Sequence, residues 1–328
     1  MKLFNRRVAI SGLAAVAGFG ALATTVQAQE YPTRNITMIV PFAAGGPTDV
    51  IARIVAADMS KTLGQQIIIE NVVGAGGTTG ATRAARAAND GYTIITGHMG
   101  THAAAVPLYP KLAYHPEKDF EPVALLAGTP ILILARKDFA PKDLKEFVTY
   151  VKANSDKLNM AHAGVGSVSY SSCELLSSVL DIKPTGVPFN GTGPAMNALV
   201  GGQVDYMCDQ IVNAVPQIKG GTIKAYAIAT PDRNPSLPDV PTTIEAGLPK
   251  YQASAWNAIF APKGTPPAIT AKLNAAAAKA LDDENVRKRL LDLGSDIPKK
   301  DGRTQAALAE LVKNEVARWS AVLKPATN

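Results

Sequence analysis

Residues 36–53 read ITMIVPFAAGGPTDVIAR, and this stretch determines the expected fold. The apolar, β-branched run at 36–40 predicts a buried strand, and Pro41, which has no N–H for a sheet ladder, ends it. Two adjacent glycines follow, where the chain can turn sharply or let a ligand approach the backbone closely. Thr48 or Asp49 can then cap a helix. The unit is either an anion site at a helix N-terminus or an ordinary turn of an α/β protein.

Strand, glycine-rich loop and helix recur along the chain. A strand at 66–73 leads into GAGGTTG at 74–80 and an alanine-rich helix, and similar loops follow at 164–167 and 188–194. Repetition of this unit is typical of parallel α/β sheets, which bind ligands at the carboxyl ends of their strands. The loop at 74–80 does not fit a dinucleotide fingerprint, because Thr79 stands where the last glycine is needed. We interpret it as a backbone cradle for an anion.

The length of 328 residues allows two domains, and two crossings between them can be proposed. Strands at 123–126 and 131–135 are expected to be broken by Gly128-Thr129-Pro130, and this break is the candidate first crossing. A strand at 253–261 is the candidate return, and the helices after it are expected to cover the first domain. The expected organisation is a signal peptide at 1–28, a first domain at 29–129 plus 252–328, and a second domain at 130–251.

The first 28 residues have the pattern of an export signal. A basic start containing Lys2, Arg6 and Arg7 precedes an apolar, alanine-rich stretch, and Val26-Gln27-Ala28 fits a cleavage site. The arginine pair suits twin-arginine export, and the general secretion route fits equally well. We therefore expect a periplasmic protein whose signal peptide is removed.

Composition excludes several classes of protein. A hydrophobic content of 47% with 18% charged residues is typical of a folded chain. Removing the three basic residues of the leader lowers the net charge from +6 to +3. Basic runs interleaved with aromatic residues are also lacking, so we expect no nucleic-acid partner.

Cys173 and Cys208 are the two cysteines of the chain. An exported protein meets an oxidising compartment, so a disulfide is chemically allowed. We nevertheless favour two buried free thiols, because Cys173 lies in an expected helix and Cys208 ends an apolar run. No Cys/His cluster has metal-ligand spacing, and neither a metal nor a cofactor is expected.

Motifs for catalysis are missing from the sequence. There is no G-x-S-x-G elbow, no H-E-x-x-H, no P-loop and no evident pair of carboxylates, so we expect a receptor without catalytic residues. His98 and His102 follow the strand at 92–96 and could contact a ligand anion, or serve as hydrogen-bonded loop residues. The alternatives are a secreted hydrolase acting on a carboxylate-bearing substrate and a ligand sensor for a signalling partner.

Six segments in order resemble one family, the Bug-type solute-binding receptors of tripartite tricarboxylate transporters. The resemblance covers essentially the whole mature chain and implies a type II periplasmic-binding-protein (Venus-flytrap) fold, with two α/β domains joined by two crossovers. The segments are VPFAAGGPTDVIAR at 40–53, NVVGAGGTTGA at 71–81, LYPKLAYHPEKDFEPV at 108–123, GVGS at 164–167, VPFNGTGPAMNALVGGQVD at 187–205 and WNAIFAPKGTP at 256–266.

The resemblance also implies a ligand site between the domains. It would hold a small organic carboxylate, with di- or tricarboxylates, aromatic acids and nicotinate-like acids all open, and deliver it to integral-membrane transporter subunits as a monomer. Together with His102, the residues expected at the site are Phe42, Ala44, Gly45, Gly46, Thr48, Gly76, Gly77 and Thr78 from the first domain, and Ser167, Ser169, Phe189, Gly191, Thr192, Gly193 and Asp209 from the second.

Overall fold

The computed structural model describes residues 30–323, so the signal peptide expected at 1–28 lies outside the described residues. None of the helices in the described part combines the length and the apolarity that crossing a membrane requires.

The first of two connected sheets is built on the stretch that opens the chain. Its strand order is β2-β1-β3-β9-β4, with β1 parallel to β2 and β3, and β9 antiparallel to β3 and β4. Parallel β1, β2 and β3 end at the same edge, so the loops after β1 and β3 lie together. The strands are β1 (Ile36–Val40), β2 (Ile67–Asn71), β3 (Thr93–His98), β9 (Ser254–Pro262) and β4 (Phe120–Arg136).

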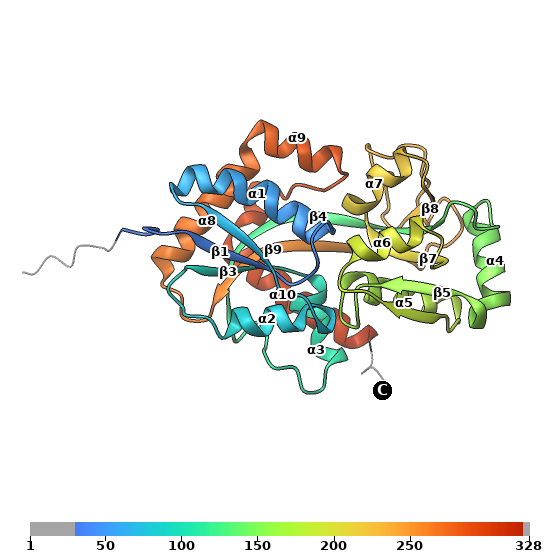
Figure 1. Cartoon of the computed structure of the whole chain (residues 1–328), viewed down its shortest axis with the longest axis horizontal. Coiled ribbons are helices and arrows are strands. Elements are labelled where there is room, and N and C mark those ends of the chain that lie inside the picture. The colour runs from blue at the N-terminus through green and yellow to red at the C-terminus, as the bar shows by residue number, and fades with distance from the viewer. Residues whose placement is uncertain (1–29, 324–328) are drawn as a thin grey trace, which may run out of the picture. The chain divides into compact units, whose positions relative to one another are not determined.

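The second sheet continues from the far half of β4, which runs through both sheets (Figure 1). Strands β7 and β8 lie on either side of β4 and antiparallel to it, while β5 is parallel to β7 and β6. We call the elements packed on the first sheet the first lobe and those packed on the second sheet the second lobe. The strands added here are β5 (Asn159–His162), β6 (Thr185–Pro188), β7 (Tyr206–Gln210) and β8 (Ile223–Ile228).

The break expected at Gly128-Thr129-Pro130 is wrong, because β4 is one continuous strand. These three residues stay paired with β9, and the irregularities of register occur earlier, between Pro122 and Ala127. Pro130 lacks an N–H group, but the N–H of Gly128 donates to Asp296 O at 2.8 Å and that of Ile131 to Ala253 O at 3.3 Å. The strand therefore continues through Pro130, because the nearby N–H groups of Gly128 and Ile131 both have hydrogen-bond partners.

Helix α1 (Pro47–Leu63) ends at Gly64, which has the left-handed φ of 73° that favours glycine, as the sequence predicts. The cap expected at Thr48 or Asp49 is wrong, because Gly46 is the N-cap and both residues lie within the first turn of the helix. The sequence predicts a helix after the strand at 92–96, and the structure has a π-helical turn at Gly100–Ala104 that leads into the short helix Ala105–Leu108. The helix at Ile211–Lys219 is not predicted, because Pro216 inside it obscures its helical pattern. The other helices are α2 (Thr78–Ala85), α3 (Ala105–Leu108), α4 (Leu144–Asn154), α5 (Val168–Leu180), α6 (Thr192–Val200), α7 (Ile211–Lys219), α8 (Pro267–Asp282), α9 (Glu284–Asp292), α10 (Gln305–Val322) and three short 3-10 segments (Ala75–Gly77, Ser155–Lys157, Lys300–Arg303).

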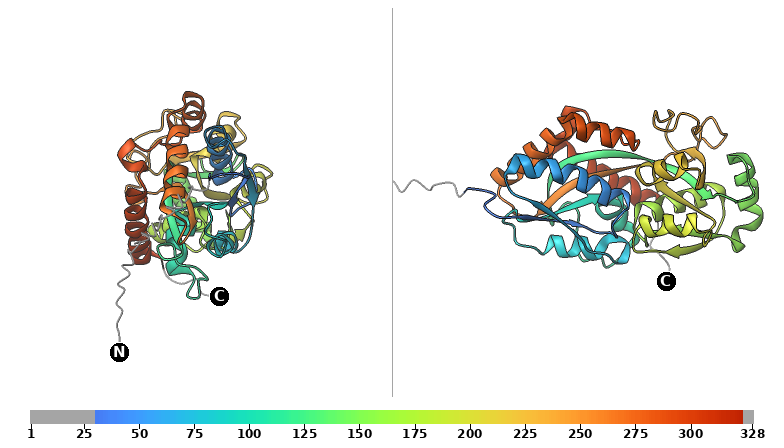
Figure 2. Two further views of the ribbon diagram at one scale, coloured as in Figure 1. Left: turned by 90° about the vertical axis from the view of Figure 1, so that its left-hand side faces the viewer. Right: turned by 45° about the horizontal axis from the view of Figure 1, so that its top comes forward.

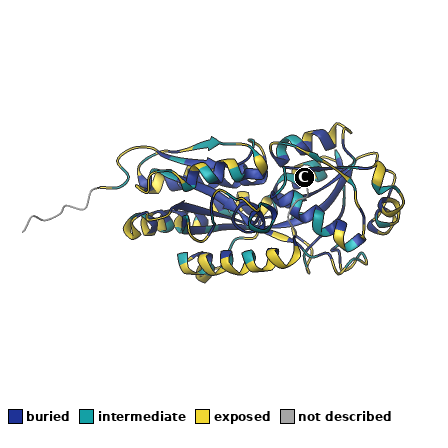
Figure 3. Ribbon diagram, turned by 90° about the horizontal axis from the view of Figure 1, so that it is seen from below, coloured by how far each residue is buried: buried dark blue, intermediate teal, exposed yellow. Residues whose placement is uncertain are grey.

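The C-terminal helices return to the first lobe, as expected. α8 packs on α1 and β4, and α10 packs on β4 and the π-helical turn (Figure 2). The strands are largely buried, whereas the helices expose their outer faces (Figure 3). Buried Leu308, Val312 and Trp319 form the inner stripe of α10 at helical spacing, which explains its docking.

Cys173 and Cys208 form a disulfide, so the free-thiol interpretation is wrong. Cys173 lies on α5 and Cys208 on β7, two elements that pack directly on each other, with 5.3 Å between the two Cα atoms. That separation lies within the range that a disulfide spans. The sequence could not reveal it, because burial of both side chains is compatible with either state.

Candidate functional site

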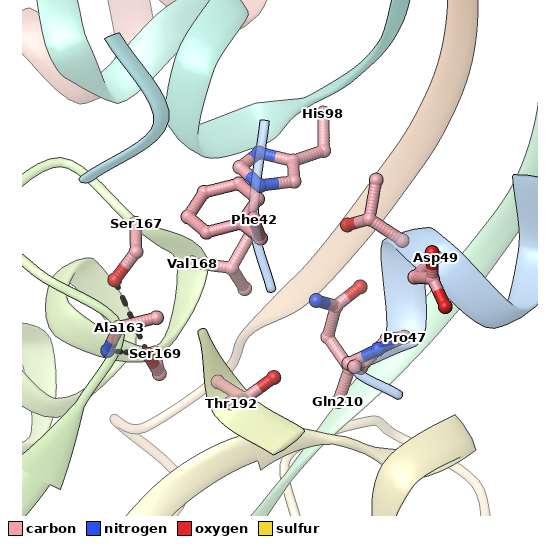
Figure 4. A pocket seen from close by; sticks show the side chains of 12 residues that line it. Phe42, Pro47, Asp49, His98, Ala163, Ser167, Val168, Ser169, Thr192 and Gln210 are labelled. Carbon is pink, nitrogen blue, oxygen red and sulfur yellow. Dashed lines mark hydrogen bonds between the residues drawn. The ribbon is translucent and has the colours of Figure 1, made fainter. Parts of the chain in front are cut away.

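A small pocket lies between the two lobes (Figure 4). Asp49 supplies the charged side chain of the lining, which otherwise consists of polar, aromatic and small groups. The lining residues are Phe42, Gly46, Pro47, Thr48, Asp49, His98, Ala163, Ser167, Val168, Ser169, Thr192 and Gln210.

Four helices begin at this cavity. α1, α5, α6 and α7 start after Gly46, Ser167, Gly191 and Gln210, respectively, and the first residues of α1, α5 and α6 line the cavity. The first N–H groups of a helix have no partner within it, and the helix dipole adds positive potential there. The cavity is therefore suited to an anion without a lysine or arginine in its lining.

Asp49 shapes the first glycine loop rather than offering its charge to a ligand. Its carboxylate accepts hydrogen bonds from the N–H of Gly45 at 3.0 Å, from Arg53 Nε at 2.9 Å and from Asn71 Nδ2 at 2.9 Å. Burial opposes the charge, but these hydrogen bonds prevail and hold the pKa of Asp49 below its usual value. The Arg53 ion pair offsets the negative charge beside the anion cavity.

Of the two histidines considered from the sequence, His98 lies at the cavity and His102 does not. The Nδ1 atom of His98 accepts the N–H of Gly100 at 2.9 Å, and its ring stacks on Phe42 with 4.9 Å between centroids. Burial lowers the pKa of His98 to about 4, so its ring is neutral with the proton on Nε2, which can donate. The structure places His102 behind it, stacked on Phe260 at 4.0 Å and fully buried in the aromatic core.

The loops of the two lobes touch beside the cavity, so the structure is in a closed form. The N–H of Ala43 donates to Asn190 O at 3.0 Å, and the Tyr109 hydroxyl donates to Val165 O at 2.6 Å. Backbones approach so closely at this seam that a Cβ on Gly76 would overlap Val165 O, and a Cβ on Gly193 would lie 3.0 Å from Ala44 O. Glycine is required at Gly76 by contact between the lobes, as well as by its φ of 61°.

The remaining predicted residues fall into three groups. The first group lines the cavity and comprises Phe42, Gly46, Thr48, Ser167, Ser169 and Thr192. The second group, Gly76, Gly77 and Phe189, lines a neighbouring pocket that shares Phe42 and Ala163 with the cavity. The third group lines neither of these two pockets and comprises Ala44, Gly45, Thr78, His102, Gly191, Gly193 and Asp209.

Gly77, which lines the neighbouring pocket, also packs closely against the cavity wall. A Cβ there would lie 2.7 Å from the ring of Phe42 and 2.7 Å from the methyl group of Thr101. The missing side chain makes room for the cavity wall, which is a packing role.

The sequence does not predict Gln210, Val168 or Tyr109 at the site, and it predicts His102 there, whereas His98 is the lining residue. Gln210 carried one usable signal, since it follows Asp209 at the carboxyl end of a strand, where open α/β sheets bind ligands. Tyr109 gave none, because its role depends on Ala75 O and Val165 O, which lie 34 and 56 positions away.

Asp209 is fully buried behind the cavity wall, where its carboxyl group holds Gln210 and Asn213 through hydrogen bonds. Its carboxyl group accepts from the N–H of Gln210 at 2.8 Å and from Asn213 Nδ2 at 2.6 Å, and Asn213 Nδ2 also donates to Thr192 O at 3.0 Å. Burial raises the pKa of Asp209 to about 7, because these hydrogen bonds only partly offset the loss of solvation.

We expect this carboxyl group to make stability fall as pH rises. Its folded pKa is about 7 and its ordinary value is 3.8, so its contribution is fully present below pH 4 and is lost as pH rises through 7. In this window it should lower the unfolding free energy by up to about 1.4 kcal/mol per pH unit. Denaturant unfolding of wild type and Asp209→Asn from pH 4 to 8 measures it, and the difference between the two slopes isolates Asp209 from the buried histidines. Equal slopes would contradict the assignment.

Comparison with known proteins shows the family of the chain. The family profile described as tripartite tricarboxylate transporter family receptor matches residues 51–327. The chain belongs to this receptor family. MatC (Rpa3494) from Rhodopseudomonas palustris, solved with bound malate, is 61% identical to this receptor, with a TM-score of 0.88, and covers 89% of this chain and 99% of its own.

Two further solved structures extend the comparison. The periplasmic binding protein BugD is 42% identical, with a TM-score of 0.86 over 89% of this receptor and 97% of its own chain. Rpa4515 of R. palustris, solved with adipate, is 32% identical, with a TM-score of 0.85 over 90% of this receptor and all of its own chain. The predicted resemblance to Bug-type receptors and the predicted periplasmic-binding-protein fold are therefore confirmed.

Proposed function

We propose that the protein is a periplasmic receptor that captures a short dicarboxylate between its two lobes and delivers it to the membrane subunits of a tripartite transporter. The observation that carries this proposal is the convergence of four helix N-termini on one small cavity whose lining contains no lysine or arginine. Such a site favours carboxylates through backbone N–H groups and dipoles.

The ligands of relatives narrow the chemical class. MatC holds malate and Rpa4515 holds adipate, which are both dicarboxylates. The cavity here contains hydroxyl groups from Thr48, Ser167, Ser169 and Thr192 in addition to helix N-termini. A four-carbon acid such as malate offers two carboxylates and one hydroxyl to these groups, so malate is the ligand to test first.

The two lobes correspond to the domains that we propose, 29–129 plus 252–328 and 130–251. The change of sheet along β4 and the start of β9 support these crossings, because Pro130 pairs with Ser254 where the first sheet gives way to the second. Because β4 and β9 both connect the two lobes, we propose that they form a hinge. The contacts that Ala43 and Tyr109 make across the seam then belong to the closed form of the receptor.

A monomeric, exported receptor without turnover is the form we propose. Its leader at 1–28 would direct it to the periplasm, and the family supplies the membrane partners. Ser167, Ser169, Thr192 and Gln210 then act as binding groups, and the ligand leaves unchanged.

Calorimetry of the mature chain with L-malate, succinate, adipate, citrate and nicotinate tests the proposal, with butyrate as a monocarboxylate control. We expect one binding site, tightest for a four-carbon dicarboxylate, and a ligand recovered chemically unchanged by mass spectrometry. Conversion of a bound acid would favour the hydrolase alternative, and failure of every acid to bind would refute the receptor.

A further inference from the structure

A buried hydrogen-bond network joins the floor of the cavity to both strands that connect the lobes. Thr129 lies on β4 and Asn257 on β9, and both are completely buried. Gln210, the last residue of β7, accepts through Oε1 from Thr129 Oγ1 at 2.7 Å and from Asn257 Nδ2 at 3.1 Å. The side-chain oxygen of Gln210 is therefore occupied by hydrogen bonds from the two connecting strands.

The network continues into the first lobe. Thr48 Oγ1, at the start of α1, donates to Asn257 Oδ1 at 3.2 Å. Since this bond occupies the oxygen of Asn257, its nitrogen is the atom left to face Gln210. Thr48 and Gln210 both line the cavity, so one chain of polar contacts links its first-lobe wall, the connecting strands and its second-lobe wall.

The nitrogen of the Gln210 amide faces the other way. Figure 4 shows the Gln210 amide extending into the space between the lobes, with its nitrogen toward the cavity. No hydrogen bond recorded within residues 30–323 uses this Nε2 atom, although the side chain is only 3% exposed. An amide nitrogen that faces the cavity without a protein acceptor is free to donate to a bound ligand.

We propose that Gln210 is a specificity-determining residue, which donates from Nε2 to a ligand carboxylate, and that Thr129 is the positioning residue that fixes the direction of its amide. The inference rests on the proposed function and deepens it. With the oxygen held by Thr129 and Asn257, the cavity receives a donor and rejects a ligand group that must itself donate, such as a carboxamide NH2.

Reversing the polarity of this one group tests the proposal. In Gln210→Glu, one oxygen can still accept from Thr129 and Asn257, while the other faces the ligand carboxylate. We expect succinate to lose affinity by roughly a hundredfold or more, because two carboxylates then meet without a donor. Succinamate, which replaces one carboxylate by a carboxamide, should lose much less. The measured quantity is the succinate-to-succinamate affinity ratio, determined by calorimetry.

Thr129→Val tests the positioning role, since it keeps the side-chain shape but removes the hydroxyl. The Gln210 amide is then held in its direction by the Asn257 donor alone and flips more readily, so succinate should weaken by about two- to tenfold and the affinity ratio should narrow toward one. Thr96→Val is the matched control, because Thr96 is also fully buried on a strand and its Oγ1 has no hydrogen-bond partner within the described residues. It should leave the ratio unchanged.

The outcomes separate this inference from the receptor function. A wild-type chain that binds succinate, together with a Gln210→Glu variant that keeps the wild-type ratio, overturns the specificity role alone. An unchanged ratio in Thr129→Val overturns the positioning role. If wild type binds neither acid nor malate, the proposed function fails and this inference fails with it. Should Gln210→Glu not fold, Gln210→Met removes the donor without adding charge and should likewise narrow the ratio.

Discussion

Replacing Gly76 by alanine should leave a folded protein that cannot close. A Cβ at Gly76 would overlap the carbonyl oxygen of Val165 in the opposite lobe, and backbone atoms on both sides leave neither partner room to move. The open form lacks this contact, so the substitution should favour it selectively. Losing the second-lobe contacts, each worth about 1.5–3 kcal/mol for a charged partner, should weaken dicarboxylate binding by at least about a hundredfold. Small-angle scattering should show no compaction when succinate is added.

Gly221→Ala is the matched control for this substitution. Gly221 has a φ of 63°, close to the 61° of Gly76, but no heavy atom lies within 4 Å of the added Cβ. Both variants therefore carry the backbone strain of an alanine in the left-handed region, about 1–2 kcal/mol, and differ in the contact across the seam. If Gly76→Ala binds and compacts as Gly221→Ala does, the seam is not part of closure.

Breaking the disulfide should lower the stability of the protein by roughly 3–4 kcal/mol. Cys173 and Cys208 are 35 positions apart, and a loop of this size removes that much entropy from the unfolded chain in the loop-closure account. The bond ties α5, which carries Ser167 and Ser169 at its start, to β7, which ends in Gln210. We therefore expect a smaller loss of ligand affinity to accompany the loss of stability.

Urea unfolding with and without a thiol reductant measures the contribution of this bond. The reductant should lower the unfolding free energy of wild type and leave that of the Cys173→Ala/Cys208→Ala double variant unchanged. The comparison isolates the bond from the loss of two buried sulfur atoms. A wild type that is indifferent to reduction would show that the two sulfurs contribute nothing as a covalent link.

The sequence predicted those parts of the fold that depend on neighbouring residues. The β-branched run before Pro41, the glycines before α1, and Ser167 at the start of α5 each act within a few positions, through side-chain packing, backbone φ and a hydrogen bond to the third residue on. Most helices and strands were therefore found, together with the glycine loops that hold the candidate site. The motif resemblance to Bug-type receptors added the predicted fold class and the expectation of a carboxylate ligand.

The tertiary structure decided which of these loops and side chains meet. It placed His98 rather than His102 at the cavity, joined Cys173 to Cys208, and carried β4 through Pro130 into the second sheet. The partners of Gln210 show why the sequence alone could not do so, since they lie 81 and 47 positions away in the chain. Such contacts depend on the pairing of distant strands, whose registers are set by the whole sheet and leave no local mark on the sequence.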